Sequence, residues 1–419
     1  MENAKKLLEF IEKSPSMFHC VNEIKNMALT AGYTEKKENE DWNFGSGKYF
    51  VSRNDSSAAL IDIPKGDIKG FHVVASHSDS PCYKVKENPD ISVEGHYRRI
   101  NVEKYGGMII NSWLDRPLSV AGRVVVDGKE GLERHLVNIS EDLMVIPNLA
   151  IHMNRDVNKG YEYHVQKDMC PLTCSIPEGK KLVEIVSDRT GIPGENILGE
   201  DLFLYVRDRG RIIGSERDMI LSPKLDDLEC VYSSVRAIIE SEAKSYINIC
   251  IVFDNEEVGS GTSQGADSTF FTDILNEIKK GLCIDECELR KMIANSLLIS
   301  ADNAHAVHPA YPEKSDPTNR PYINGGVVIK YHGGQKYTTD GRTGAMIKAM
   351  CKRAGVPYQT FANHSDSAGG STLGNISTAH VSMPSVDIGL PQLAMHSAVE
   401  TAGVRDLGYL IKLLKEFYQ

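Results

Sequence analysis

Histidines and carboxylates gather in five short polar clusters, and four of these clusters come shortly after a run of apolar residues. The clusters are centred on His77-Ser78-Asp79, Lys224-Leu225-Asp226, Asn255-Glu256-Glu257, Asp302-Asn303-Ala304-His305 and Met395-His396. Imidazole nitrogens and carboxylate oxygens are the side-chain atoms that bind divalent metal ions such as Zn²⁺. Taken together, the five clusters predict a metal site.

Taken singly, three of these clusters also have an ordinary structural explanation. Asp226 could cap a helix, and His396 could be a hydrogen-bonded histidine of the core. His77 fits either a hydrogen-bonded histidine at a strand end or a metal ligand. In the second case Asp79 would fix the tautomer of the imidazole and raise its basicity.

Glu256 and Glu257 follow the most apolar run of the chain, residues 246–253. Two adjacent carboxylates at the end of a buried strand are costly unless they are paired or bind a metal. Neighbouring residues of extended backbone point to opposite sides, so one glutamate can bind a metal while the other faces the substrate. The alternative is a solvated acidic loop.

Two histidines and three carboxylates suit two divalent ions with mixed nitrogen and oxygen ligands. Zn²⁺ is the default ion, and Co²⁺ and Mn²⁺ are the alternatives. Asp226 can bridge both ions, and two ions about 3.5 Å apart would clamp a shared water and lower its pKa. Glu256 would then take the proton of that water and later give it to a leaving amine.

The elements that must position these clusters are predicted by hydrophobic periodicity. Apolar runs predict buried strands at 70–76, 246–253, 296–301 and 384–389. Helical patterns lie at 228–243, 270–278, 343–354 and 402–417, and two short helices broken at Ser14-Pro15-Ser16 open the chain. The segment 49–63 predicts two strands joined at Asn54-Asp55. Strands that alternate with helices predict an α/β fold with a mixed, mostly parallel sheet flanked by helices, and reactive groups gather at the carboxyl ends of such strands.

The stretch from residue 86 to 218 differs, because it is rich in β-branched residues and carries hairpin signals. These signals are Lys104-Tyr105-Gly106-Gly107-Met108 and Val126-Asp127-Gly128-Lys129. We therefore expect a discontinuous α/β domain, residues 1–85 and 219–419, interrupted by a β-rich domain over 86–218.

Composition narrows the class of protein. The chain has 419 residues, 41% of them apolar, so a large core can form and disorder is excluded for most of it. With 47 Lys and Arg against 57 Asp and Glu, the net charge is −10, which argues against nucleic acid as a partner. We expect neither a signal peptide nor a membrane span. Nine cysteines without framework spacing favour reduced thiols and a cytoplasmic protein.

The ordered motifs resemble those of the M18 metallopeptidases, the aspartyl aminopeptidase family. The resemblance rests on the five clusters and on two further stretches, Ile146 to Arg155 and Ser365 to Thr372, and it runs along essentially the whole chain. It implies that the β-rich insertion is a dimerisation domain and that dimers assemble further, typically into dodecamers that admit only peptides. It also implies one metal ion held by His77, Asp226 and Asp302, and a second held by Asp226, Glu257 and His396.

The resemblance also implies the remaining roles. Glu256 is the general base, Asp79 orients His77, and His152 reaches the active site of a neighbouring subunit, where it can stabilise an oxyanion. Candidate substrate-binding residues are Lys330, Asp366, Gly370 and Ser371. A lysine in a partly dry pocket would select an acidic N-terminal residue by charge pairing, whereas a solvated strand lysine is the alternative. One departure follows His396, where the chain reads Ser397-Ala398-Val399-Glu400 and lacks the usual arginine before the glutamate.

The sequence therefore predicts a dinuclear-metal aminopeptidase that removes N-terminal residues from peptides, with an acidic preference. Three alternatives stay open. The enzyme could prefer neutral or apolar N-terminal residues, it could be a dinuclear amidohydrolase or carboxypeptidase, or the protein could be a non-catalytic peptide-binding scaffold.

Overall fold

A nine-stranded sheet forms the larger part of the protein, seen in a computed structural model that describes residues 1–129, 131–176, 178–367, 369–370 and 372–419. Its strand order is β1-β2-β3-β13-β4-β14-β18-β16-β17, and its four central strands, from β13 to β18, run parallel. The strands are β1 Thr34–Lys36, β2 Gly47–Arg53, β3 Ser57–Ile63, β4 Gly70–His77, β13 Tyr246–Phe253, β14 Leu297–Ala301, β16 Val327–Tyr331, β17 Tyr358–Ala362 and β18 Ser385–Gly389. The mixed, mostly parallel sheet predicted from the apolar runs is thus confirmed.

The central strands are buried on both faces, which explains why they read as continuous apolar runs. Along β4, Val74 packs into one core while Val73 and Ala75 pack into the other. Strand β13 alternates in the same way, with Cys250 on one side and Ile251 on the opposite side.

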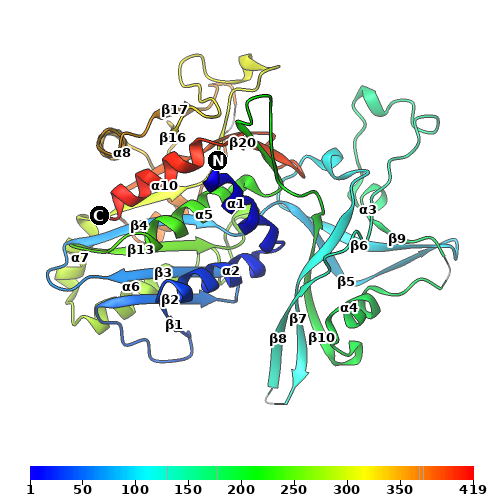
Figure 1. Cartoon of the computed structure of the whole chain (residues 1–419), viewed down its shortest axis with the longest axis horizontal. Helices are drawn as coiled ribbons and strands as arrows, with labels where there is room; N and C mark the ends of the chain where they lie inside the picture. Colours follow the sequence, from blue (N-terminus) through cyan, green and yellow to red (C-terminus); the bar gives the residue numbers. More distant parts are fainter. Residues whose placement is uncertain (130, 177, 368, 371) are drawn as a thin grey trace.

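Helices cover both faces of this sheet (Figure 1). One core packs against α1 Glu2–Lys13, α2 Met17–Thr30, α5 Leu225–Ile239, α8 Gly341–Ala354 and α10 Asp406–Phe417. The other packs against α6 Phe270–Gly281, α7 Glu286–Ala294 and α9 Leu373–His380. The predicted helices are all present, although the last one begins at Asp406 because residues 400–403 form a strand.

A six-stranded antiparallel sheet with its own core forms the second part of the protein, on the right in Figure 1. Its order is β8-β7-β10-β5-β6-β9. The elements are β5 Cys82–Val93, β6 Tyr97–Tyr105, β7 Leu118–Gly128, β8 Gly131–Asn138, α3 Val165–Asp168, β9 Leu172–Cys174, α4 Leu182–Thr190 and β10 Ile197–Val206.

Of the two hairpin signals, one is confirmed and one is wrong. Strands β7 and β8 pair up to Gly128 and Gly131, as predicted. Tyr105 instead ends β6, and the glycines after it lead into a 3-10 turn. The reason is that β10 and β5 lie between β7 and β6 in the sheet, so these two consecutive strands cannot pair.

A small five-stranded sheet has the order β11-β12-β20-β19-β15. It includes the two strands that follow β10 in the chain and the short strands that follow β14 and β18. Its strands are β11 Arg211–Ile213, β12 Met219–Ser222, β15 Ala304–His305, β19 Pro391–Leu393 and β20 Glu400–Gly403. The 3-10 turns are η1 Ile110–Trp113, η2 Val157–Lys159, η3 Gly194–Asn196, η4 Glu256–Val258 and η5 Pro312–Lys314. Among the described residues, no helix combines the length and the apolar character needed to cross a membrane.

Candidate metal centre

Three parallel strands end side by side and bring most of the predicted ligands to one edge of the large sheet. His77 is the last residue of β4 and lies in register with Phe253, the last residue of β13. Glu256 and Glu257 follow β13, and Asp302 follows the neighbouring β14. The carboxyl ends of parallel strands thus deliver side chains far apart in sequence to one place.

Asp226 lies at the centre of this site. Its Oδ1 atom is 3.7 Å from Nε2 of His77, and its Oδ2 atom is 3.4 Å from Nε2 of His396. Asp302 Oδ1 lies 4.0 Å from the same nitrogen of His77, and Glu257 Oε1 lies 3.3 Å from that of His396. The described residues form three groups of potential ligands here, and Asp226 belongs to two of them.

Asp79 is a buried carboxylate that organises the site from behind. The backbone N–H groups of Glu256 and Glu257 donate to its two oxygens over 3.2 and 3.1 Å. Nδ1 of His77 lies 3.1 Å from the Asp79 carbonyl oxygen and 3.4 Å from its carboxylate. This nitrogen is thereby engaged, which leaves Nε2 to face Asp226 and Asp302.

The backbone at the paired glutamates is not extended, so that part of the prediction is wrong. Asn255 adopts a left-handed φ of 62°, and the chain turns immediately into η4. The turn is stabilised because Asp79 accepts the N–H groups of both glutamates. Both glutamates have a carboxylate oxygen within 4.8 Å of a ring nitrogen of His77, and Glu257 also contacts His396.

Burial and mutual repulsion shift the protonation of the cluster. Burial raises the pKa of Glu256 to about 8 and that of Glu257 to about 7. Burial lowers the pKa of His396, but hydrogen bonds to Asp226 and Glu257 outweigh it and raise the pKa to about 11. The cluster therefore holds protons that a bound cation would displace.

The donor set fits divalent cations. Each group combines imidazole nitrogen with carboxylate oxygen, and its ligand atoms lie within 4.8 Å of one another. Within the described part of the chain, Asp226 Oδ1 is buried and has no hydrogen-bond partner. A buried carboxylate oxygen without a donor is costly, and a cation between Asp226 and His77 would satisfy it.

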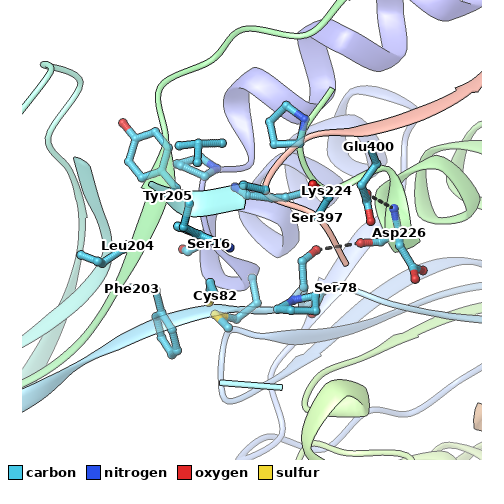
Figure 2. A pocket seen from close by; sticks show the side chains of 18 residues that line it. Ser16, Ser78, Cys82, Phe203, Leu204, Tyr205, Lys224, Asp226, Ser397 and Glu400 are labelled. Atoms are coloured by element: carbon cyan, nitrogen blue, oxygen red, sulfur yellow. Dashed lines mark hydrogen bonds between the residues drawn. The ribbon is translucent and has the colours of Figure 1, made fainter. Parts of the chain in front are cut away.

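Glu400 was not predicted as a site residue, yet it holds two of the predicted ligands. Its carboxylate accepts the backbone N–H of Asp226 over 3.0 Å and that of His396 over 2.7 Å. Figure 2 shows it beside Asp226 at the end of a small cavity that Lys224 and Tyr205 also line. The sequence signal that could have identified Glu400 is its position four residues after His396, at the start of β20.

Asp227 was also overlooked, because it adjoins Asp226 and resembles a helix-cap pair. It is fully buried, and its carboxylate accepts the backbone N–H of His77 over 3.2 Å. One of its oxygens also lies in the group formed by His77, Asp226 and Asp302.

Lys330 is buried at the edge of the cluster. Its ammonium donates to the Asn303 carbonyl over 2.8 Å and to Asp302 Oδ2 over 3.2 Å, and it lies 5.4 Å from the centre of the Tyr337 ring. Burial lowers the pKa of Lys330, but the charge of Asp302 outweighs it and raises the pKa. The solvated strand lysine considered as an alternative is therefore wrong.

The other predicted residues lie outside this cluster. His152 is exposed in the loop after residue 146, and the Asp366 side chain is 92% exposed. Gly370 is exposed as well, and Ser371 lies outside the described residues. No hydrogen bond or ion pair of the described residues joins His152 or Asp366 to the carboxylates at the strand ends.

An α/β sheet that gathers imidazoles and buried carboxylates at its carboxyl edge defines a metal-dependent hydrolase site. The family model described as aminopeptidase I zinc metalloprotease (M18) matches residues 10–418. The chain belongs to the M18 family and is an aminopeptidase of the metallopeptidase class.

Named relatives agree with this assignment. A probable M18 family aminopeptidase 2 of Clostridium acetobutylicum is 45% identical over 100% of this chain and 99% of its own length. A relative of the same description from Pseudomonas aeruginosa strain UCBPP-PA14 is 37% identical, over 98% and 97% of the two chains. The structure described as the cryo-EM structure of the Ape4 and Nbr1 complex matches with a TM-score of 0.95 and 32% identity, covering 99% of this chain and 85% of that one.

Proposed function

We propose that the protein is a dinuclear-metal aminopeptidase. One ion would be held by His77, Asp226 and Asp302, and the other by Asp226, Glu257 and His396. The observation that carries this proposal is the Asp226 carboxylate, whose two oxygens face two different imidazoles. Zn²⁺ is the ion that this donor set and the family description favour, with Co²⁺ and Mn²⁺ as alternatives.

When bound, the metal supplies Lewis-acid chemistry, which lowers the pKa of a water and polarises a carbonyl. Glu256 is the general base: it accepts a proton from the attacking water and returns it to the leaving amine. Asp79 fixes the orientation of His77 and the backbone of both glutamates. Glu400 fixes the backbone of Asp226 and His396 in the same manner.

A free α-amine should be required. Zinc-loaded protein should release the N-terminal residue of an unblocked peptide. It should cleave the N-acetylated form of the same peptide about 10²-fold more slowly or not at all, because a site that binds a free amine discriminates against a substrate that lacks one. Mass spectrometry of the products checks this. Release of C-terminal residues would favour a carboxypeptidase, and absence of both cleavage and metal uptake would favour a scaffold.

We also propose that acidic N-terminal residues are preferred and that Lys330 contributes to this choice. Its support is a buried ammonium beside the proposed ligand Asp302 and the Tyr337 ring. Asp366, Gly370 and Ser371 are proposed to complete the substrate site on sequence grounds alone. A preference for neutral or apolar residues is the alternative, because Asp302 already neutralises part of the Lys330 charge.

Lys330→Met should lower the ratio of kcat/KM for Asp over Leu substrates by about 10–100-fold, the value of one charge-assisted hydrogen bond. The ratio is the informative quantity, since losing the Asp302 contact slows all substrates together. Rates on Asp, Glu, Leu and Met p-nitroanilides measure it. Lys348→Met, whose ammonium lies over Tyr331, is the matched control. An unchanged ratio would remove Lys330 from the specificity assignment.

The chain is proposed to divide into a catalytic domain, residues 1–85 and 219–419, and a dimerisation domain, residues 86–218. The separate core of the six-stranded sheet supports the division. Around His152, Leu149, Ile151 and Met153 are 55%, 48% and 71% exposed, which suits a loop that is covered in an assembly. We propose that this loop brings His152 to a neighbouring active site, in dimers that build a dodecamer. A cytoplasmic location is proposed from the nine free cysteines.

A further inference from the structure

Tyr105, the last residue of β6, belongs to the insertion but touches the metal centre. Its hydroxyl donates to Asp79 Oδ2 over 2.8 Å and accepts a hydrogen bond from Asn255 Nδ2 over 2.8 Å. The ring packs edge-on against Phe203, with 5.6 Å between ring centres, and only 8% of the residue is exposed. The hydroxyl thus joins the insertion to the carboxylate that organises the site.

The direction of the hydroxyl proton follows from the neighbours of Asn255. Thr262 and Gln264 both donate to Asn255 Oδ1, over 2.7 and 2.8 Å, so the amide must present its N–H₂ group to Tyr105. The tyrosine oxygen is therefore an acceptor toward Asn255, and its own proton points at Asp79. Burial raises the pKa of Tyr105, so the hydroxyl stays protonated and remains a donor.

The residues after Tyr105 also contact the ligand-bearing loops. Gly106 has a φ of 77°, and a Cβ atom there would lie only 3.0 Å from Cβ of Glu257. The backbone of the insertion therefore packs so closely against Glu257 that it leaves little room for a side chain at this position. Further on, the Ile109 N–H donates to the His396 carbonyl over 2.9 Å. Ser112 Oγ accepts the Ala398 N–H over 2.8 Å.

We infer that Tyr105 is a positioning residue for the reaction, which it serves by holding the Asp79 carboxylate toward His77 and toward the backbone of Glu256 and Glu257. The inference rests on the proposed metallopeptidase function. Asp79 accepts three hydrogen bonds, and Tyr105 supplies the only one that comes from outside the catalytic strand ends among the described residues. Removing it would free the carboxylate to rotate and loosen both the histidine and the base.

Tyr105→Phe keeps the ring and deletes the donor. In the zinc-loaded enzyme it should lower kcat about 10–100-fold with KM changed less than about 2-fold, and weaken zinc binding about 10–100-fold in a chelator competition, the usual cost of losing a partner behind a metal ligand. The control is Tyr83→Phe on the adjoining β5, whose buried hydroxyl has no partner within the described part of the chain. It should behave as the parent enzyme does.

Two further measurements separate positioning from folding. Replacing Tyr105 with p-aminophenylalanine restores an N–H donor and should recover kcat and zinc affinity. Combining Tyr105→Phe with Asp79→Asn should cost no more than Asp79→Asn alone, because both changes act through the same carboxylate. Full additivity, or unchanged kcat and zinc affinity in Tyr105→Phe, would overturn the inference. If the parent enzyme itself fails to cleave an unblocked peptide, the proposed function fails instead.

Discussion

Glu256→Gln should lower kcat by about 10²–10⁴-fold while leaving the bound metal and the fold in place. The amide keeps the size of the side chain but cannot accept a proton from water. Glu256 belongs to neither of the two proposed ligand sets, so metal content measured by atomic absorption should not change.

The control for this variant is Glu216→Gln, an exposed glutamate of the insertion. It should retain the parent rate. A Glu256→Gln enzyme that hydrolyses peptides at near the parent rate would show that another group is the base. Loss of metal together with activity would instead mean that Glu256 is a ligand.

Asp226→Asn should abolish both metal sites at once and reduce peptidase activity by more than about 10³-fold. Both carboxylate oxygens face imidazoles, and an amide supplies only one neutral oxygen to replace them. The test is the thermal unfolding temperature, Tm, measured at increasing zinc concentrations. Zinc should raise the Tm of the parent protein, because a ligand that binds the folded state stabilises it, and should leave the variant unchanged.

Asp62→Asn is a suitable control for removing a buried carboxylate. Asp62 is 5% exposed and accepts the Ala243 N–H over 3.0 Å, far from the strand ends that carry the metal ligands. The variant should lose some stability but bind zinc with the parent stoichiometry. If Asp226→Asn still binds two zinc ions per chain, Asp226 does not bridge them.

The predicted strands and most of the proposed ligands were accessible from sequence because each depends on local pattern. An apolar run such as residues 246–253 identifies a buried strand, and polar residues directly after it identify the reactive edge. The geometry of Glu256 and Glu257 was not accessible, since it depends on Asp79 accepting their N–H groups from a different strand.

Contacts between residues of different sheets could not be predicted from the local sequence pattern either. Tyr105 looked like the start of a hairpin, because nothing local indicates that β10 and β5 would separate β6 from β7. Glu400 looked like one more acidic residue near a strand. Its role depends on reaching the backbone of Asp226, 174 residues earlier in the chain.

Two contacts between the insertion and the metal centre, Tyr105 with Asp79 and Ile109 with His396, determine what a deletion of the insertion can show. A version that joins residue 81 directly to residue 207 would retain every proposed ligand, yet Asp79 would lose its tyrosine donor and the His396 carbonyl would lose the Ile109 N–H. Inactivity of such a deletion would therefore say nothing about subunit assembly. Assembly is better separated from catalysis by point changes in the exposed loop around His152, which leave the contacts of Tyr105 and Ile109 intact.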